Sequence, residues 1–242
     1  LPRRYSDIVS RNRNRARQGV PMRIMRYLKA WISVLLAASM LLTVPVLPTV
    51  AADDPVQSAA ATDPVAMYSR GVTWDQFLAS TRVERETWLK NAGREVPPGL
   101  VDRFKRAGDG LRLLVITADW CPDSLHSVPY IARLAAGAGV EMRLVDFKTG
   151  KAIMDAHRTP DGRASTPTVI LLRGDQEVAA WAERPASLQW WYLGMADAIS
   201  EEELLERKMS WYDWNRGSDA LTEIVVLAEK TAKKTGSAPR SH

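Results

Sequence analysis

The residues best suited to chemistry lie in one short segment, residues 118–124 (Ala-Asp-Trp-Cys-Pro-Asp-Ser), which holds the only cysteine of the 242-residue chain. A dense apolar run over residues 111–117 predicts a buried strand before this segment, and Pro122 favours the first turn of a helix after it. Cys121 would then lie beside the unpaired N–H groups at the start of that helix. Their dipoles favour the thiolate, which is the nucleophilic form of cysteine.

Three neighbouring polar residues bear on the charge of this thiol. Ser124 falls three positions after Cys121 on the same helical face and could donate a hydrogen bond to the thiolate. Asp119 and Asp123 would oppose its negative charge, so the sequence leaves the direction of the net pKa shift open. A free cysteine at a strand–helix junction can also be an inert apolar residue, and this reading stays open as well.

A second motif follows 46 residues after Cys121, where Thr166-Pro167-Thr168 precedes another apolar run. Together the two motifs resemble the thioredoxin superfamily, whose Trp-Cys-x-x-Cys site lies between a strand and a helix and faces a cis-proline. More closely, the chain resembles a bacterial thioredoxin-like group with a Trp-Cys-x-Asp site, an N-terminal helical extension and an Arg-Pro pair after the last strand, here at 184–185. The resemblance covers residues 74–230.

Two departures from the superfamily pattern remove parts of its dithiol chemistry. Ser124 occupies the position of the second cysteine, and Val115 stands where thioredoxins usually carry a buried aspartate. The resemblance therefore implies monothiol exchange, in which Cys121 forms a mixed disulfide that an external thiol releases. The implied partners are a disulfide-containing protein or a low-molecular-weight thiol, and no cofactor is implied.

The expected site has two parts. The catalytic residues are Cys121 and Ser124. The residues expected to shape a substrate groove are Trp120, Pro122, Thr166 and Pro167.

Two other functions compete with this one. In the first, the chain is a redox-inactive module that keeps the thioredoxin groove to hold a peptide or a partner protein, and Cys121 is incidental. The second is a cysteine hydrolase, which we disfavour because His126, five residues past Cys121, would point about 140° away on a helix.

The net charge of +5 arises from the N-terminal segment. Residues 1–52 hold nine of the 33 basic residues and one of the 28 acidic ones, which leaves 24 basic and 27 acidic residues at positions 53–242. The part expected to fold is therefore slightly acidic, and a nucleic-acid partner is not expected.

The N-terminal segment has the order of a secretory signal. Basic residues after Met22 precede an apolar run, which ends in small residues before the acidic pair at 53–54. We expect residues 22–52 to be a signal peptide and residues 1–21 to be an upstream, non-structural segment. We therefore expect the protein to be exported and to be periplasmic or extracellular. If this segment stays uncleaved, it would instead anchor the protein in the membrane.

The rest of the chain predicts one α/β domain over residues 71–234, a thioredoxin-like mixed sheet with flanking helices and with N- and C-terminal helical extensions. Residues 53–70 read as a linker and residues 235–242 as a loose tail. Seven aromatic residues near the C-terminus are expected to cover the core: Trp181, Trp190, Trp191, Tyr192, Trp211, Tyr212 and Trp214. Thr73 is the expected N-cap of the first helix. The expected helices are 73–91, 99–107, 122–136, 153–157, 187–209 and 219–233, and the expected strands are 111–117, 140–147, 169–172 and 177–181.

Overall fold

The computed structural model describes residues 62–234. The predicted upstream segment 1–21, the signal peptide 22–52 and the tail 235–242 lie outside these residues. Between residues 62 and 234, no helix is both long enough and apolar enough to cross a membrane.

Four strands form one mixed sheet: β1 (Leu111–Thr117), β2 (Glu141–Asp146), β3 (Thr168–Arg173) and β4 (Gln176–Ala182). Their order across the sheet is β2-β1-β3-β4. The β1–β2 pair is parallel, while β1–β3 and β3–β4 are antiparallel. The predicted mixed sheet and the predicted hairpin are confirmed.

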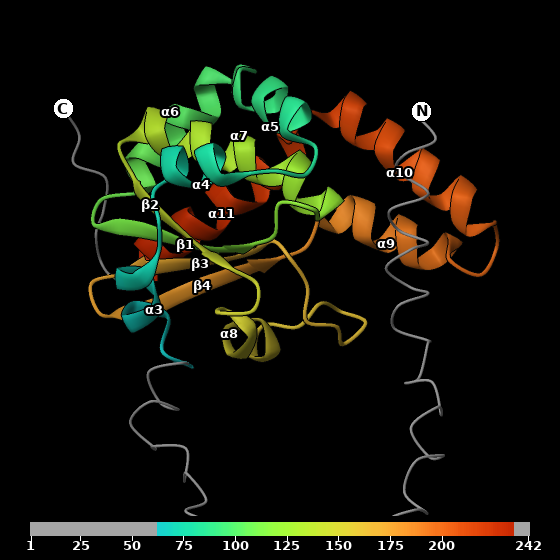
Figure 1. The fold of residues 1–242 in the computed structure, drawn as a ribbon. Helices are drawn as coiled ribbons and strands as arrows, with labels where there is room; N and C mark the ends of the chain where they lie inside the picture. The colour runs from blue at the N-terminus through green and yellow to red at the C-terminus, as the bar shows by residue number, and fades with distance from the viewer. Residues whose placement is uncertain (1–61, 235–242) are drawn as a thin grey trace, which may run out of the picture. The chain divides into compact units, whose positions relative to one another are not determined.

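Helices cover both faces of the sheet. The described helices are α3 (Pro64–Arg70), α4 (Trp74–Ser80), α5 (Arg85–Ala92), α6 (Pro98–Ala107), α7 (Pro122–Ala138), α8 (Lys151–Ala156), α9 (Ala186–Met195), α10 (Glu201–Asn215) and α11 (Ser218–Lys234). In Figure 1, α4 to α7 and α11 lie on one side of the strands, and α3 and α8 lie on the other.

The alternation of side chains along the central strand explains the two layers. Leu113 and Val115 of β1 belong to the larger core with α5, α6, α7 and α11, whereas Leu114 and Ile116 belong to the smaller core with α3 and α8. A strand buried on both faces is apolar along most of its length, which is why residues 113–116 form a continuous apolar run with no alternating pattern.

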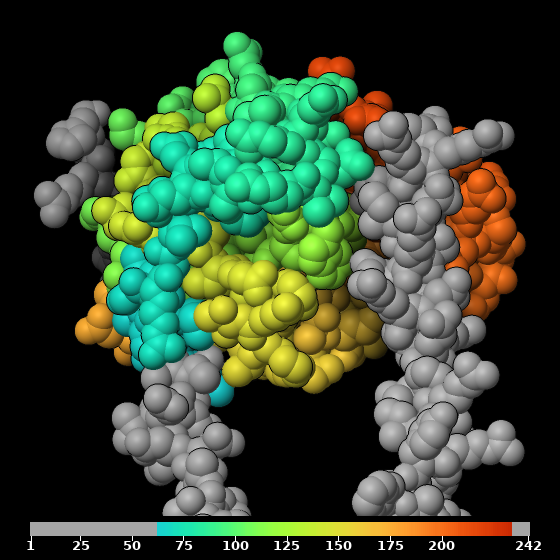
Figure 2. Space-filling view, viewed as in Figure 1, coloured from blue at the N-terminus to red at the C-terminus, as the bar shows by residue number. Residues whose placement is uncertain are grey.

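The expected linker at 53–70 is wrong for residues 64–70, which form α3 (Pro64–Arg70), and its residues 53–61 lie outside the described part of the chain. The Asp63 side chain caps this helix by accepting a hydrogen bond from the Val65 N–H. Met67 and Tyr68 are buried against the smaller core. In Figure 2 the cyan residues of this segment lie against the yellow residues around α8, so the segment is part of the domain.

Two long helices expected from the sequence are each divided in two. The expected helix 73–91 begins at its predicted cap, where Thr73 forms a capping box with Gln76, but it breaks between α4 and α5 at Glu84, whose φ is 51°. The expected helix 187–209 breaks between α9 and α10, where the Ser200 side chain caps α10. These two helices pack around a small apolar cluster of their own, centred on Leu188, Met209 and Tyr212.

Candidate functional site

Cys121 lies at the N-cap of α7, directly after the turn that follows β1. Its N–H donates to the carbonyl of Ala118 at 3.1 Å, which closes that turn. The turn is held from the N-terminal helices, because the indole Nε1–H of Trp88 donates to the carbonyl of Asp119 at 3.0 Å. The Asp119 carboxylate in turn accepts the N–H groups of Arg82 and Val83, at 3.0 and 3.3 Å.

The second motif lies directly against this thiol. The Cys121 Sγ donates a hydrogen bond to the carbonyl oxygen of Thr166 at 3.2 Å, and the Thr166–Pro167 peptide bond is cis. The two motifs meet because β1 and β3 are antiparallel neighbours, with Ile116 opposite Thr168. Each motif lies at the same end of this strand pair.

The Cys121 side chain is shielded, with a relative exposure of 6%. Burial raises the pKa of the thiol, and the negative charge of Asp123 raises it further. The side chain of Thr166 and the backbone and side chain of Ser124 lower the pKa, but they do not outweigh burial. The net shift in the pKa of Cys121, whose direction the sequence left open, is therefore upward. The folded protein favours the protonated thiol over the thiolate.

Ser124 lies where the sequence placed it, one turn into α7, and its side chain is completely buried. Its hydroxyl is near enough to the sulfur to lower the pKa of Cys121. The same oxygen makes no well-formed hydrogen bond with any residue between 62 and 234. A buried hydroxyl with spare capacity can respond to a change of charge on the neighbouring sulfur.

The expected groove residues surround Cys121 at different depths. Trp120 is 46% exposed and its ring meets Phe147 edge to face, with 5.4 Å between ring centroids. Pro122 and Thr166 are half-buried, whereas Pro167 is buried. The exposed indole thus stands beside a recessed thiol.

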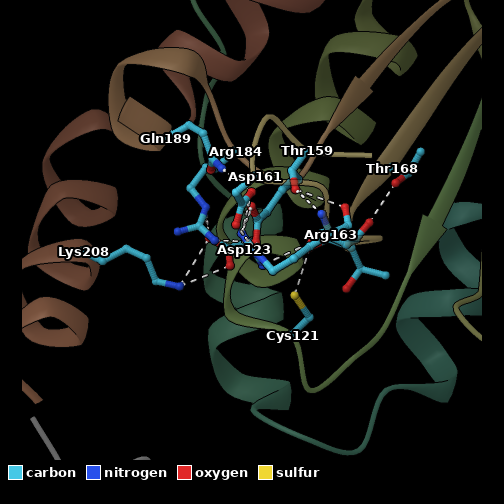
Figure 3. A network of polar contacts seen from close by, with 12 residues as sticks. Cys121, Asp123, Thr159, Asp161, Arg163, Thr168, Arg184, Gln189 and Lys208 are labelled. Carbon is cyan, nitrogen blue, oxygen red and sulfur yellow. Dashed lines mark hydrogen bonds and ion pairs between the residues drawn. The ribbon is translucent and has the colours of Figure 1, made fainter. Parts of the chain in front are cut away.

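Asp123 is the unexpected centre of the site. Its buried carboxylate accepts hydrogen bonds from Lys208 Nζ at 3.1 and 3.4 Å and from the Tyr212 hydroxyl at 2.6 Å, and Arg184 Nε lies 3.6 Å away (Figure 3). Burial acts to raise the pKa of Asp123, but the charges of Lys208 and Arg184 together lower it below its ordinary value. Asp123 is therefore a carboxylate within the protein interior.

The network continues from Arg184 through two acidic residues. Arg184 pairs with Glu183, a buried residue with a φ of 66°. The Glu183 carboxylate accepts hydrogen bonds from both terminal nitrogens of Arg163, each at 2.9 Å, and Arg163 also pairs with Asp161. Three acidic and three basic side chains, counting Lys208, thus balance one another across four segments of the chain.

Sequence reasoning missed the partners of Asp123. It did not single out Lys208, and it placed Tyr212 among residues covering the core, yet both are buried at the site. The covering role is wrong for Trp190 and Trp214, which are 64% and 76% exposed. The spacing of the aromatic residues does not separate the buried from the exposed ones, because they are consecutive in α9 (190–192) and nearly so in α10 (211, 212 and 214) and so do not follow one helix face.

His126 is a buried residue stacked on Tyr212, with 5.0 Å between ring centroids. Burial lowers the pKa of its imidazole to about 4. His126 is therefore neutral at pH 7.

A cavity with a volume of about 540 Å³ opens between β4, α9 and α11. Arg184 of the Asp123 network lines it, but none of the six expected site residues does. Among residues 62–234, no group of three or more His, Cys, Asp and Glu side chains could hold a metal ion.

Comparisons with known proteins agree with this architecture. The family described as Thioredoxin matches residues 71–203. A crystal structure of a protein of unknown function from Pseudomonas aeruginosa is similar, with 16% identity, a TM-score of 0.54, and coverage of 69% of this chain and 98% of that one. An HIV epitope-scaffold is similar at 17% identity and a TM-score of 0.52, covering 69% and 97%. No curated protein matches the chain. At these identities the solved structures support the fold alone.

Proposed function

Because the chain belongs to the thioredoxin family, we propose that it is a thiol–disulfide exchange protein of the cell envelope that works through Cys121 alone. The observation that carries the proposal is the contact of Cys121 Sγ with the Thr166 carbonyl beside cis-Pro167, at the start of α7. In this arrangement the only cysteine of the chain is next to helix N–H groups, which stabilise a thiolate.

The reaction has two steps. Cys121 first loses its proton to solvent, and its thiolate attacks one sulfur of a substrate disulfide. A bond forms between Cys121 Sγ and that sulfur, while the other substrate sulfur leaves as a thiolate. A small external thiol, as its thiolate, then attacks the substrate sulfur of the mixed disulfide. A new disulfide forms between the external thiol and the substrate, and Cys121 leaves as a thiolate. Ser124 supplies no second sulfur, so the chain itself cannot perform the release.

The surroundings of Cys121 give each step a physical basis. In the resting protein the Thr166 carbonyl accepts the thiol hydrogen, and that hydrogen bond is lost when the proton leaves. The Ser124 hydroxyl, which has spare hydrogen-bonding capacity, is positioned to donate to the sulfur once it carries charge. Trp120, exposed beside the thiol, offers an apolar surface to an approaching substrate.

The compartment and the partners belong to the same proposal. The order of basic, apolar and small residues over 22–52 supports export, and a disulfide substrate is typical of an oxidising compartment. A disulfide-containing protein and a small thiol are the partners. The acidic balance of residues 53–242 gives no support for nucleic-acid binding.

The burial of Cys121 favours a second candidate, a redox-inactive module that binds a peptide or partner protein beside Trp120 and Pro167. The 6% exposure and the raised pKa both act against attack on a bulky disulfide in the resting conformation. In this case the Thr166 and Trp120 surfaces would bind a partner without any covalent step.

One experiment separates the two functions. The reduced protein is incubated with oxidised glutathione at pH 7 to 9 and its intact mass is followed, with Cys121→Ser as the control. Exchange predicts the gain of one glutathione by the wild type and none by the control. A folded protein that stays unmodified, but is modified once denatured, would overturn the exchange function and favour the binding module.

A further inference from the structure

The C-terminal helical extension reaches the thiol through one buried ion pair. Lys208, on α10, lies 87 positions after Cys121 in the sequence, yet its ammonium group contacts the carboxylate of Asp123, two positions after the thiol (Figure 3). Both partners are buried. A lysine is seldom fully buried unless it is paired, so the contact with Asp123 accounts for the burial of Lys208.

Lys208 is the one cation of the network that serves Asp123 alone. Arg184 divides its charge between Asp123 and Glu183, and Arg163 pairs with Glu183 and Asp161. Among the described residues Lys208 donates its hydrogen bonds only to Asp123, and its ammonium lies over the Tyr192 ring, 5.5 Å from the centroid. Removing Lys208 would therefore leave Arg184, which also pairs with Glu183, as the one remaining cation of the network beside Asp123.

Asp123 is also well placed to act on Cys121. It occupies the first turn of α7, whose N-cap is Cys121, and both side chains are shielded from water. Charges in such an environment interact more strongly than on the surface. Other ionisable groups beside Asp123 are Arg184 after β4, His126 on α7 and Tyr212 on α10, and Asp119 lies two positions before the thiol. Glu183 pairs with Arg184, and the charges of Asp213 and Arg94 act on His126.

We propose that Lys208 is a positioning residue for Cys121. By pairing with Asp123 it holds the first turn of α7 and neutralises the Asp123 carboxylate, so that packing of α10 against α7 sets the ionisation of Cys121. The consequence of this coupling for function rests on the proposed exchange chemistry. The coupling itself is a property of the folded protein that can be measured without any disulfide substrate.

Because the chain has a single cysteine, labelling cysteine with ¹³C at Cβ gives one resonance whose pH titration reports the ionisation of Cys121 in the full chain. Asp123→Asn is expected to shift the titration midpoint down by about one pH unit, since it removes a like charge. Lys208→Met is expected to shift the midpoint up. Asp123 remains ionised at the pH where a cysteine titrates, because Arg184 and Tyr212 still contact it.

Two further variants show whether the effect is electrostatic. Lys208→Arg keeps the charge and is expected to keep the wild-type midpoint. Arg207→Met removes a neighbouring cation that pairs with Glu203 on the exposed side of α10, and it is expected to change nothing. The dispersion of the amide resonances shows whether Lys208→Met folds. If it does not fold, the titration midpoint of Asp123→Asn is the test.

Midpoints of Asp123→Asn and Lys208→Met that equal those of the wild type and Arg207→Met would overturn the proposal. A downward shift in Lys208→Met would also overturn it. The glutathione experiment fails or succeeds separately: shifted midpoints without glutathione addition would refute exchange and leave the coupling standing.

Discussion

The side-chain amide of Asn91 donates a hydrogen bond at 3.0 Å to the carbonyl oxygen of Leu125, the carbonyl that Pro129 leaves without a partner inside α7. In a continuous helix the N–H of residue 129 would bond to this carbonyl, but proline has no N–H. Asn91 lies on α5 and is buried. A helix of the N-terminal extension thus completes the helix that begins at Cys121.

Asn91→Ala is expected to lower the free energy of unfolding by about 1–3 kcal/mol, because a buried carbonyl loses its donor. In a Pro129→Ala background the new N–H at position 129 can donate to that carbonyl. Asn91→Ala should therefore lower the free energy of unfolding by less in this background than in the wild type. Urea unfolding of the four proteins gives the coupling as a double-mutant cycle. Equal costs in both backgrounds would show that Asn91 does not replace the missing helical bond.

The folded protein should alkylate slowly at neutral pH. A raised pKa means that less of Cys121 is thiolate at a given pH than for an exposed cysteine, whose pKa is about 8.5. When the rate of reaction with iodoacetamide is measured from pH 6 to 10, the pH at which this rate rises should therefore be higher for the folded chain than for the chain unfolded in urea. Ser124→Ala should move the folded profile still higher, since it removes a group that lowers the pKa. A folded profile that lies below that of the unfolded chain would contradict this reading of the site.

His126 should make the protein less stable as the pH falls from about 6.5 to about 4. Its pKa is about 4 in the fold and returns to the ordinary value near 6.5 on unfolding, so the unfolded state binds the extra proton in this window. The contribution is fully present above pH 6.5 and amounts to about 3 kcal/mol for a shift of this size. Urea midpoints across this range should fall with pH in the wild type.

His126→Gln is the control for this pH dependence, because glutamine does not titrate. Its urea midpoints should be flatter between pH 4 and 6.5. Asp123, whose pKa is lowered, contributes stability that is present above its unfolded value near 4 and is lost below it, so the two effects fall in different windows. Identical slopes for wild type and His126→Gln would exclude the imidazole as the source.

Ser124→Cys should convert the site into a dithiol. The two positions are three residues apart at the start of α7, and both side chains are buried. Mild oxidation with diamide should close a disulfide within the chain, seen as the loss of two hydrogens in the intact mass and the loss of both free thiols. Ser127→Cys, also buried but further along the helix, is the matched control and should keep two free thiols. Two free thiols in oxidised Ser124→Cys would refute the expected proximity.

The sequence by itself determined the parts of this protein that depend on local pattern. The apolar run at 111–117 predicted β1, Pro122 predicted the start of α7, and Thr73 predicted a helix cap, and each was confirmed. The order of strands and helices around Cys121 and Pro167 predicted the family and the mixed sheet. Such features follow from chain stereochemistry and from the period of apolar residues, which act within a few positions.

Only the tertiary structure decided the charge balance at the site. Lys208, Tyr212 and Arg184 lie more than sixty positions beyond Asp123, and nothing in their local sequence distinguishes a buried partner from a solvated or covering residue. The same holds for the pKa of Cys121, where the helix start favours the thiolate but burial outweighs it. Desolvation and Coulomb energy depend on distances through space and on the exclusion of water, and these exist only once the chain has folded.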